Sequence, residues 1–394
     1  MSAVDELIAT RRDLHRHPEL AFEENRTARL VASRLRGFGL AVREHVGRTG
    51  VVADIGRPGR GPDVVVRAEM DGLPIDEAGD RPFRSTRAGV MHACGHDGHT
   101  AILLAVARDL AARANDLPGR VRLLFQPAEE TGQGSIAMIE DGALDGSAWT
   151  GALALHLRPF MMAGSIGICR GPAAARVGEF DVEVIGEGGH GGRPHASVDA
   201  LLAGVEIVTA LQTLIPREVS ALDSAVLSVC SFHGGTAANV MPASVNFAGT
   251  VRTAKDEVYD QLLGRAAELA VAVGRGFRCS VEMNVREMMP AVWNDPTVAA
   301  VARDAATAVV GADRVLEVEP VMAGDDVARI FERVPGCYVF LGAAHDDGRP
   351  PTPNHSPVWD FDERVLPIGA SVLLEAVDRL LTSPLPGDPP SSRT

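Results

Sequence analysis

Residues 91–100 read Met-His-Ala-Cys-Gly-His-Asp-Gly-His-Thr, and the rest of the chain is organised around this stretch. Cys94 and His96 are one residue apart, so an irregular backbone would let both reach one metal centre. A thiolate and an imidazole suit zinc and neighbouring transition metals, whereas calcium and magnesium prefer oxygen ligands. Asp97 and Gly98 offer the turn and N-cap chemistry that would start the helical run 101–110. Taken alone, the stretch leaves a capped helix with a buried thiol open as an alternative.

Length and composition indicate a globular protein without nucleic-acid or membrane partners. The chain has 394 residues, enough for two domains, and 46% of them are hydrophobic. The 38 basic residues do not balance the 52 acidic ones, and no basic run offsets the net charge of −14. Five widely spread cysteines, an odd number, favour reduced thiols over a disulfide framework. With no signal-peptide pattern and no apolar run long enough to span a bilayer, we expect a cytoplasmic protein.

Short apolar runs alternate with helical patterns in the first half of the chain and again near its end. Strands are predicted at 51–55, 64–68, 121–126, 151–157 and 337–341, and helices at 4–16, 23–35, 101–110, 296–310 and 367–381. This alternation predicts an α/β fold with a mostly parallel sheet and helices on both faces. Ligand-type side chains stand at or after the strand ends, where open α/β sheets place their chemistry. They are Asp71, Glu129, Glu130, His156 and, in the loop 350–357, His355.

The pattern between 178 and 290 differs from that of the rest of the chain. Its predicted elements follow the order β-α-β-β-α-β, at 180–185, 197–215, 225–232, 245–252, 256–277 and 279–288. That order is the ferredoxin-like split motif, a complete small α+β domain. We therefore expect a catalytic domain at 1–177 and 291–381, an inserted domain at 178–290, and a disordered tail at 382–394, which is rich in Pro and Ser.

Several further motifs occur in a fixed order along the chain. They are His-Pro-Glu-Leu (17–20), Arg-Ala-Glu-Met-Asp-Gly-Leu-Pro-Ile (67–75), the stretch 91–100, Gln-Pro-Ala-Glu-Glu (126–130), Gly-Gly-His-Gly-Gly-Arg-Pro-His (188–195), Gly-Gly-Thr-Ala-Ala-Asn-Val-Met-Pro (234–242) and Gly-Thr-Val-Arg-Thr (249–253). Together they resemble the binuclear metal-dependent amidohydrolases and carboxypeptidases that act on N-acyl amino acids, such as aminoacylases, hippurate hydrolases and indole-acetyl-amino-acid hydrolases. The resemblance extends to about residue 381 and implies a zinc-peptidase-like catalytic domain with an inserted dimerisation domain.

The resemblance also implies a set of site residues. Its metal ligands fall on Cys94, His96, Glu130, His156 and His355. Five such ligands exceed the needs of one tetrahedral zinc, so two divalent ions per chain are expected, with Cys94 as the bridge. The ions would be zinc, manganese, cobalt or nickel. Glu129 matches the family's general base, and Asp71 would orient a ligand imidazole. His92 and His99 are interpreted as packing or capping residues.

Residues of the inserted domain are expected to complete the site. His190 would contact the substrate and reach the partner subunit's site in a homodimer or a dimer of dimers. Asn239 precedes the strand 245–252 and Arg252 ends it, so both can lie on one rim and hold the substrate's free carboxylate. The alternative for Arg252 is an internal ion pair. Gly324 is a further expected substrate-binding residue.

The function implied is hydrolysis of the amide bond of a small N-acyl amino acid. An exopeptidase on the same scaffold and a non-catalytic ligand-binding protein remain alternatives. A closed structural zinc site would need no spare carboxylate beside it. A Cys94 nucleophile would leave three of the expected ligands unexplained. The chain departs from the family pattern beside the ligand positions, which bears on acyl-group and metal preference. The departures are Glu69 for a usual Asp, Arg158 for a common aromatic residue, and Gly324-Asp325-Asp326 for Gly-Ser-Glu-Asp.

Overall fold

The computed structural model describes residues 2–382, which form two compact units. Unit 1 comprises the chain up to Ala173, Trp293–Glu319 and the chain from Asp325 on. Unit 2 comprises Ala174–Val292 and the short segment Pro320–Gly324, whose return to this unit the sequence did not suggest. Thr382, assigned to the tail by the sequence, is instead the last residue of a helix. The rest of that predicted tail, 383–394, lies outside the described residues.

Unit 1 is built on an eight-stranded sheet in the order β1-β2-β4-β3-β5-β16-β6-β15. The strands are β1 (Val42–Val46), β2 (Gly50–Gly56), β3 (Asp63–Glu69), β4 (Arg120–Gln126), β5 (Gly151–Arg158), β6 (Ile166–Ile168), β15 (Val315–Glu317) and β16 (Gly336–Gly342). The neighbours β4, β3, β5 and β16 are parallel, whereas β2 and β6 run antiparallel to their neighbours in this group. The predicted α/β fold with a parallel-rich sheet is confirmed. The carboxyl ends of β3, β4 and β5 therefore meet at one edge.

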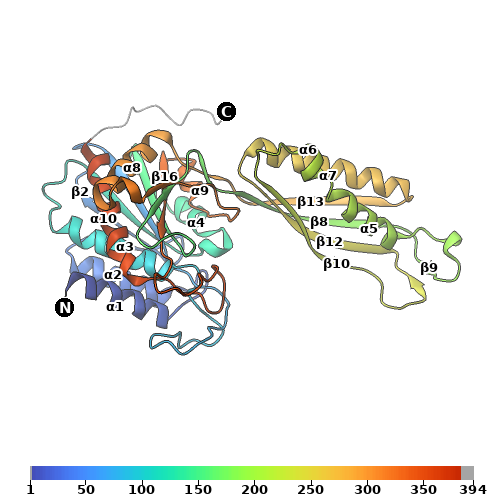
Figure 1. The fold of residues 1–394 in the computed structure, drawn as a ribbon, viewed down its shortest axis with the longest axis horizontal. Coiled ribbons are helices and arrows are strands. Elements are labelled where there is room, and N and C mark those ends of the chain that lie inside the picture. The colour runs from blue at the N-terminus through green and yellow to red at the C-terminus, as the bar shows by residue number, and fades with distance from the viewer. Residues whose placement is uncertain (1, 383–394) are drawn as a thin grey trace. The chain divides into compact units, whose positions relative to one another are not determined.

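Helices pack along this sheet and supply the apolar core of unit 1. They are α1 (Ala3–Arg16), α2 (Asn25–Gly37), α3 (His96–Ala111), α4 (Gly134–Glu140), α8 (Pro296–Val310), α9 (Ala328–Phe331) and α10 (Leu366–Thr382). α3 and α10 pack against each other and against β3 and β5 (Figure 1). Ile102 of α3 and Leu373 of α10 are buried with Leu155 and Leu341 of the central strands. Burying each such side chain contributes about 1.5–3 kcal/mol, so this packing fixes α3, and with it the stretch 91–100, over the strand ends.

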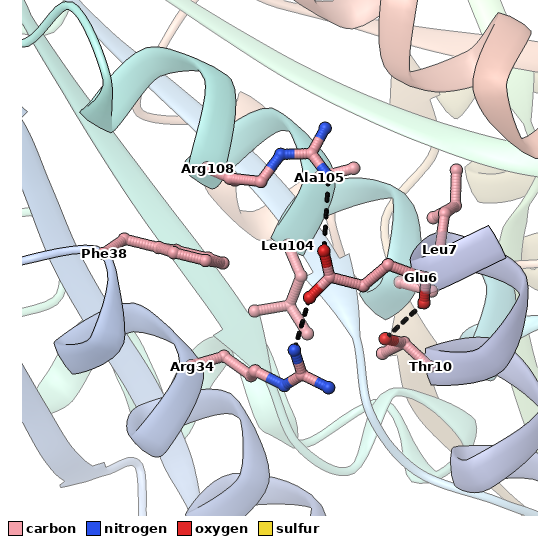
Figure 2. Close-up of a pocket in the computed structure, with 9 residues that line it drawn as sticks. Glu6, Leu7, Thr10, Arg34, Phe38, Leu104, Ala105 and Arg108 are labelled. Carbon is pink, nitrogen blue, oxygen red and sulfur yellow. Dashed lines mark hydrogen bonds and ion pairs between the residues drawn. The ribbon is translucent and has the colours of Figure 1, made fainter. Parts of the chain in front are cut away.

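A small cavity lies where α1, α2 and α3 meet. Glu6 of α1 forms ion pairs with Arg34 of α2 and Arg108 of α3 (Figure 2). These side chains are partly exposed, so each pair contributes at most about 1 kcal/mol to stability. The cavity beside them has a volume of about 20 Å³, which is room for one water molecule. Its size makes it an element of helix packing and not a substrate site.

Unit 2 contains one antiparallel sheet in the order β10-β12-β8-β13, covered on one face by helices (Figure 1). The elements are β8 (Arg176–Ile185), α5 (Ala200–Leu211), α6 (Leu214–Glu218), β10 (Ala225–His233), β12 (Ser244–Thr253), α7 (Asp256–Gly276) and β13 (Ser280–Met289). The β-α-β-β-α-β order matches the prediction, except that the helix expected at 197–215 is two helices. Pro216 has no N–H to donate to the carbonyl of Gln212, so a new helix, α6, begins at Leu214 with the proline in its first turn.

A two-stranded ribbon extends unit 2 at one end. β9 (Gly189–His190) pairs with β11 (Val240–Met241), just beyond the end of β8 and the start of β12. Figure 1 shows β9 at this end of the unit. The ribbon therefore carries His190 away from the end of the sheet where β8 begins. None of the helices within residues 2–382 is long and apolar enough to cross a bilayer.

Candidate metal centre

The stretch 91–100 is a loop that turns sharply into α3. The helix begins at His96 and its N-cap is Gly95, whose φ of 104° lies in the left-handed region that favours glycine. The prediction that Asp97 and Gly98 supply the N-cap is wrong. The Asp97 carboxylate points into the interior, where it pairs with Arg11 at 2.9 Å and His15 at 2.8 Å. This buried pairing fixes the first turn of α3 and so orients His96.

The structure brings the five expected ligands together around Cys94. Ligand-type atoms of Cys94, His96 and His156 lie within 4.8 Å of one another. The same holds for Cys94, Glu130 and His355. Cys94 belongs to both groups, which is the arrangement expected of a bridging ligand. Glu130 lies in the turn that follows β4, and His156 lies on β5. Both strands run parallel to β3, so they end at the same edge of the sheet and bring the two side chains together.

Two of the imidazoles hold their Nδ1 atoms against backbone carbonyls and turn their Nε2 atoms toward this cluster. The Nδ1 atom of His96 is 2.9 Å from the Asp71 carbonyl oxygen and 3.2 Å from its carboxylate. The Nδ1 atom of His156 is 2.8 Å from the Leu157 carbonyl oxygen. A carbonyl can only accept, so Nδ1 carries a proton in both rings and Nε2 is the atom left to bind a metal; the Nε2 atom of His156 lies 3.5 Å from the Cys94 sulfur. Asp71 also accepts a hydrogen bond from the Glu130 N–H at 2.9 Å. Asp71 thus orients two expected ligands: it contacts the imidazole ring of His96 and the backbone N–H of Glu130.

The electrostatics of the cluster fit a bound cation. Burial raises the pKa of Cys94 to about 12, with the nearby Glu130 acting in the same direction. Burial, with neighbouring His99, lowers the pKa of His156 to about 3. Among the described residues, the buried His96 Nε2 and Glu130 Oε1 atoms have no hydrogen-bond partner. An unpaired imidazole nitrogen and an unpaired carboxylate oxygen in a buried cluster are costly unless a positive charge lies among them, and a bound cation would also favour the thiolate form of Cys94. The donor set of sulfur, nitrogen and oxygen suits divalent transition metals.

His355 is held by a strained backbone. Its φ of 65° lies in the left-handed region, at a cost of roughly 1–3 kcal/mol for a residue other than glycine. The His355 N–H donates to the Ala93 carbonyl at 2.8 Å, and its Nε2 atom lies 3.3 Å from Glu130. The preceding Asn354 donates to the Cys94 carbonyl at 3.3 Å. Backbone strain of this kind accumulates at functional sites. Sequence reasoning missed the role of Asn354. The signal that could have revealed it was its position next to His355.

Glu129 occupies the place of a proton acceptor beside the cluster. It begins a single turn of 3-10 helix after β4, and its Oε2 atom lies 3.7 Å from His96 Nε2. Burial raises the pKa of Glu129 well above its usual range, and the nearby carboxylates of Asp325 and Glu130 raise it further. A carboxylate with a raised pKa takes up a proton readily. The two adjacent glutamates therefore differ in surroundings, as base and ligand would.

The departures from the family pattern at Glu69 and Asp325-Asp326 form a buried ion network behind the site. Arg67 of β3 pairs with Glu69 and lies 3.0 Å from carboxylate oxygens of Asp325 and Asp326. The Tyr338 hydroxyl donates to Asp325 at 2.8 Å. One guanidinium thus faces three carboxylates, and burial, with the neighbouring Asp325, raises the pKa of Asp326 to about 7. The network ties β3 and β16 to the segment that follows residue 324.

His99 has a positioning role that the sequence did not reveal. Its Nδ1 atom lies 2.9 Å from the Glu69 carboxylate, and its Nε2 atom accepts a hydrogen bond from the Leu157 N–H at 3.0 Å. Its ring centre is 4.6 Å from that of His156. His99 therefore supports the strand end that carries His156. The signal was its spacing three residues after His96, which puts both rings on one face of α3.

The expected site residues of unit 2 are not all close to one another. His190 is exposed on β9, and the Asn239 carbonyl accepts the Gly191 N–H at 2.9 Å, so the two lie at the same end of the unit. Arg252 pairs in register with Val177 at the other end of β12, about 26 Å along the strand from its start. The prediction that Asn239 and Arg252 lie on one rim is therefore wrong within one chain. Asn239 precedes the ten-residue strand β12, and Arg252 lies near the far end of that strand.

Arg252 and Gly324 are held by contacts inside unit 2. The Arg252 guanidinium donates to the Met322 carbonyl at 2.9 Å, and no carboxylate among residues 2–382 pairs with it. The alternative of an internal ion pair is therefore not seen. A Cβ added at Gly324 would lie 2.7 Å from the Met289 sulfur and 2.9 Å from Val177. Close packing thus explains the glycine, and its expected part in substrate binding stays a prediction.

The fold and site together define a metal-binding hydrolase: a parallel-rich α/β sheet with clustered ligand-type side chains and a spare buried carboxylate at its strand ends. Residues 65–379 match the model of peptidase family M20/M25/M40, and the chain belongs to this family. The chain is accordingly an enzyme that hydrolyses amide bonds.

Three similar proteins illustrate the family. N-acetyl-L-cysteine deacetylase of Bacillus subtilis is 37% identical over 378 residues, covering 96% of this chain and 89% of that protein. An IAA-amino acid hydrolase, ILR1-like 5 of Arabidopsis thaliana, is 34% identical over 382 residues, covering 96% of this chain and 87% of that protein. The crystal structure of the Bacillus subtilis YXEP protein, described as a dinuclear metal binding peptidase, superimposes with a TM-score of 0.85 at 31% identity, covering 97% of this chain and 99% of that one.

Proposed function

We propose that this chain is a metal-dependent amidohydrolase that cleaves the amide bond of N-acyl amino acids to give an amino acid and a carboxylic acid. The observation that carries the proposal is the buried Glu129 beside the two groups of ligand-type residues that share Cys94. The names of the bacterial deacetylase and of the plant hydrolase, both similar over nearly their whole length, support the substrate class.

Two divalent ions per chain are the proposed cofactor, as zinc, manganese, cobalt or nickel. One group of ligands would be Cys94, His96 and His156, and the other Cys94, Glu130 and His355. When bound, such ions supply Lewis-acid chemistry to the scissile carbonyl and to the attacking water. Asp71 keeps the His96 ring in the orientation and tautomer that this requires. The similar Bacillus subtilis YXEP protein is described as a dinuclear metal binding peptidase, which supports two ions per chain.

Glu129 is the proposed general base and acid. It would accept a proton from the attacking water while the water oxygen forms a bond to the acyl carbon. As the carbon–nitrogen bond breaks, the same carboxyl would deliver this proton to the leaving amine. The position of Glu129 beside His96 supports both halves of the transfer, and burial, which raises the pKa of Glu129, favours uptake of the proton. The His190 imidazole is proposed to donate to the carbonyl oxygen as negative charge develops there.

A homodimer, or a dimer of dimers, is the proposed assembly. Leu201, Leu202 and Val205 of α5 expose 38%, 45% and 44% of their surface, an apolar patch that supports an interface. Asn239 and Arg252 lie at opposite ends of β12, so they can grip a single small substrate only from different chains. This geometry supports a site in which His190 and Asn239 belong to the partner of the chain that supplies Arg252. The expected cytoplasmic location stays a prediction.

The test is a substrate panel on protein stripped of metal and reloaded with zinc, manganese, cobalt or nickel. N-acetyl and N-benzoyl amino acids should be hydrolysed, chelation should abolish the activity, and metal analysis should approach two ions per chain. Turnover of dipeptides alone would indicate the exopeptidase. Full metal loading without turnover of any member would indicate a binding protein. Activity indifferent to chelators but lost on thiol alkylation would contradict the metal mechanism.

A further inference from the structure

Arg158 is the last residue of β5 and lies two residues after the expected ligand His156. Successive side chains of a strand point to opposite faces, so both side chains lie on one face, about 7 Å apart along the strand. Phe340 of β16 pairs in register with His156, and its ring centre lies 4.7 Å from the Arg158 guanidinium carbon. Arg158 therefore sits beside the metal centre, within the reach of a long side chain, with its guanidinium stacked on an aromatic ring.

The guanidinium of Arg158 has no anionic partner. No carboxylate, hydroxyl or carbonyl among residues 2–382 binds it, although the chain is strongly acidic. Other arginines with buried side chains in unit 1 do have carboxylate partners, as Arg67, Arg120 and Arg122 show. The stacking on Phe340 stabilises the cation by about 0.5–2 kcal/mol and orients it without satisfying its donors. Five N–H donors are thus left at the edge of the site.

The neighbours of Arg158 leave its charge uncompensated. Burial raises the pKa of the Cys169 thiol to about 11, so this neighbour is neutral at physiological pH. The Tyr338 hydroxyl is occupied as a donor to Asp325, and burial raises its pKa well above the usual range. Arg158 itself remains a cation, because a guanidinium is not deprotonated in proteins. A half-buried cation without a counter-ion favours an anionic ligand.

We propose that Arg158 binds a second anionic group of the substrate, so that the enzyme prefers N-acyl amino acids carrying a carboxylate besides the α-carboxylate. The inference rests on the proposed function. The second carboxylate belongs either to a dicarboxylic acyl group or to an acidic amino acid side chain. In either case a guanidinium fork can bind it through two parallel hydrogen bonds.

Two matched substrate pairs separate these sources. N-succinylalanine is compared with its terminal amide, and N-acetylglutamate with N-acetylglutamine, with N-acetylalanine as the reference. The acid of one pair should have the higher kcat/KM by at least about tenfold. Arg158→Leu should bring that ratio close to one and leave N-acetylalanine nearly unchanged, whereas Arg158→Lys should retain part of the preference. Arg170→Leu, at an arginine 80% exposed, is the control and should change neither ratio.

The outcomes distinguish this inference from the proposed function. Turnover of N-acetylalanine without preference in either pair overturns the inference alone. Equal losses on all five substrates in Arg158→Leu overturn it too, because Arg158 would then hold the common α-carboxylate or the fold. Calorimetry on metal-loaded Glu129→Gln protein needs no turnover: the preferred acid should bind at least about tenfold tighter than its amide. Equal affinities there would overturn the inference whatever the enzyme hydrolyses.

Discussion

The buried carboxylate of Glu24 accepts a hydrogen bond from the backbone N–H of Ala128, 104 residues further along the chain, at 2.9 Å. It also accepts the Phe22 N–H at 3.0 Å and the Thr49 hydroxyl at 2.5 Å. Ala128 has a φ of 51°, a left-handed conformation that is strained for alanine, and it directly precedes Glu129. Glu24 therefore holds the turn that aims Glu129 at the metal centre.

Truncation of Glu24 should impair the chemical step. Glu24→Ala leaves the buried Ala128 N–H and Thr49 hydroxyl without their acceptor, at a cost of about 1–3 kcal/mol for each group. It also removes the acceptor of the partly buried Phe22 N–H and frees the strained turn. We expect kcat to fall by at least about tenfold, with a smaller change in KM. Glu24→Gln is the matched control, because its carbonyl can accept both N–H groups while its amide donates to Thr49. A folded Glu24→Ala protein with unchanged kcat would show that the turn at Ala128 keeps its conformation without Glu24.

The same residue should make stability depend on pH. Burial raises the pKa of Glu24 to about 7, above the 4.5 of an unfolded chain. Between these values the unfolded chain releases its proton first, so stability falls as pH rises, by up to about 3 kcal/mol in all. Glu24→Gln lacks this loss. In denaturant unfolding, the free energy of unfolding of Glu24→Gln should increase relative to that of the wild type from pH 5 to pH 8. Glu23→Gln, at an exposed neighbour, should show no such trend, and a pH-independent difference would refute the assignment.

Glu129 and Glu130 should separate by phenotype. Glu129→Gln should keep the fold and the bound metal but lose at least about a hundredfold in kcat, the usual contribution of a general base. Glu130→Gln should lose metal, because its carboxylate lies among Cys94 and His355. Metal analysis and kcat on each variant check both statements. Swapped phenotypes would mean that the two roles are reversed.

His190 should act on the active site of the partner subunit. Subunits carrying His190→Ala and subunits carrying Glu129→Gln are each expected to be inactive. A mixed dimer contains one site with both groups intact, so mixing should restore part of the activity. Subunit exchange is verified independently by mass spectrometry of differently tagged chains. Exchange without rescue would place His190 in the site of its own chain, or in neither.

Arg252 should contribute to binding of the substrate's α-carboxylate. Arg252→Ala should weaken kcat/KM for an N-acyl amino acid by roughly 2–4 kcal/mol, the scale of losing one partner of a buried charge pair. The corresponding amino acid amide lacks that charge and should be nearly unaffected. The measurement is the acid-to-amide ratio of kcat/KM in wild type and variant. Equal losses on both substrates would make Arg252 structural, through its hydrogen bond to Met322.

Local sequence pattern predicted the fold, whereas the candidate ligands came from the resemblance of the ordered motifs to a known family and are side chains that the structure brings together. Buried β-branched runs predict the central strands, and parallel strands place their carboxyl ends at one edge of a sheet. Asp71, Glu130 and His156 therefore had to approach one another. The short strands β6 and β15 escaped prediction, since three residues carry too little periodicity.

Tertiary structure alone decided which residues distant in sequence contact each other and which are kept apart. No local pattern shows that Asp97 turns inward to Arg11, or that Glu24 caps Ala128, because each partner is chosen by how helices and strands pack. The length of β12 separates Asn239 from Arg252, although both belong to motifs that stand close together in the sequence. The missing counter-ion of Arg158 likewise becomes visible only when every neighbour is in place. Sequence thus determined which chemical groups are present, and packing determined which of them meet, because contacts between distant segments depend on the whole arrangement of the core.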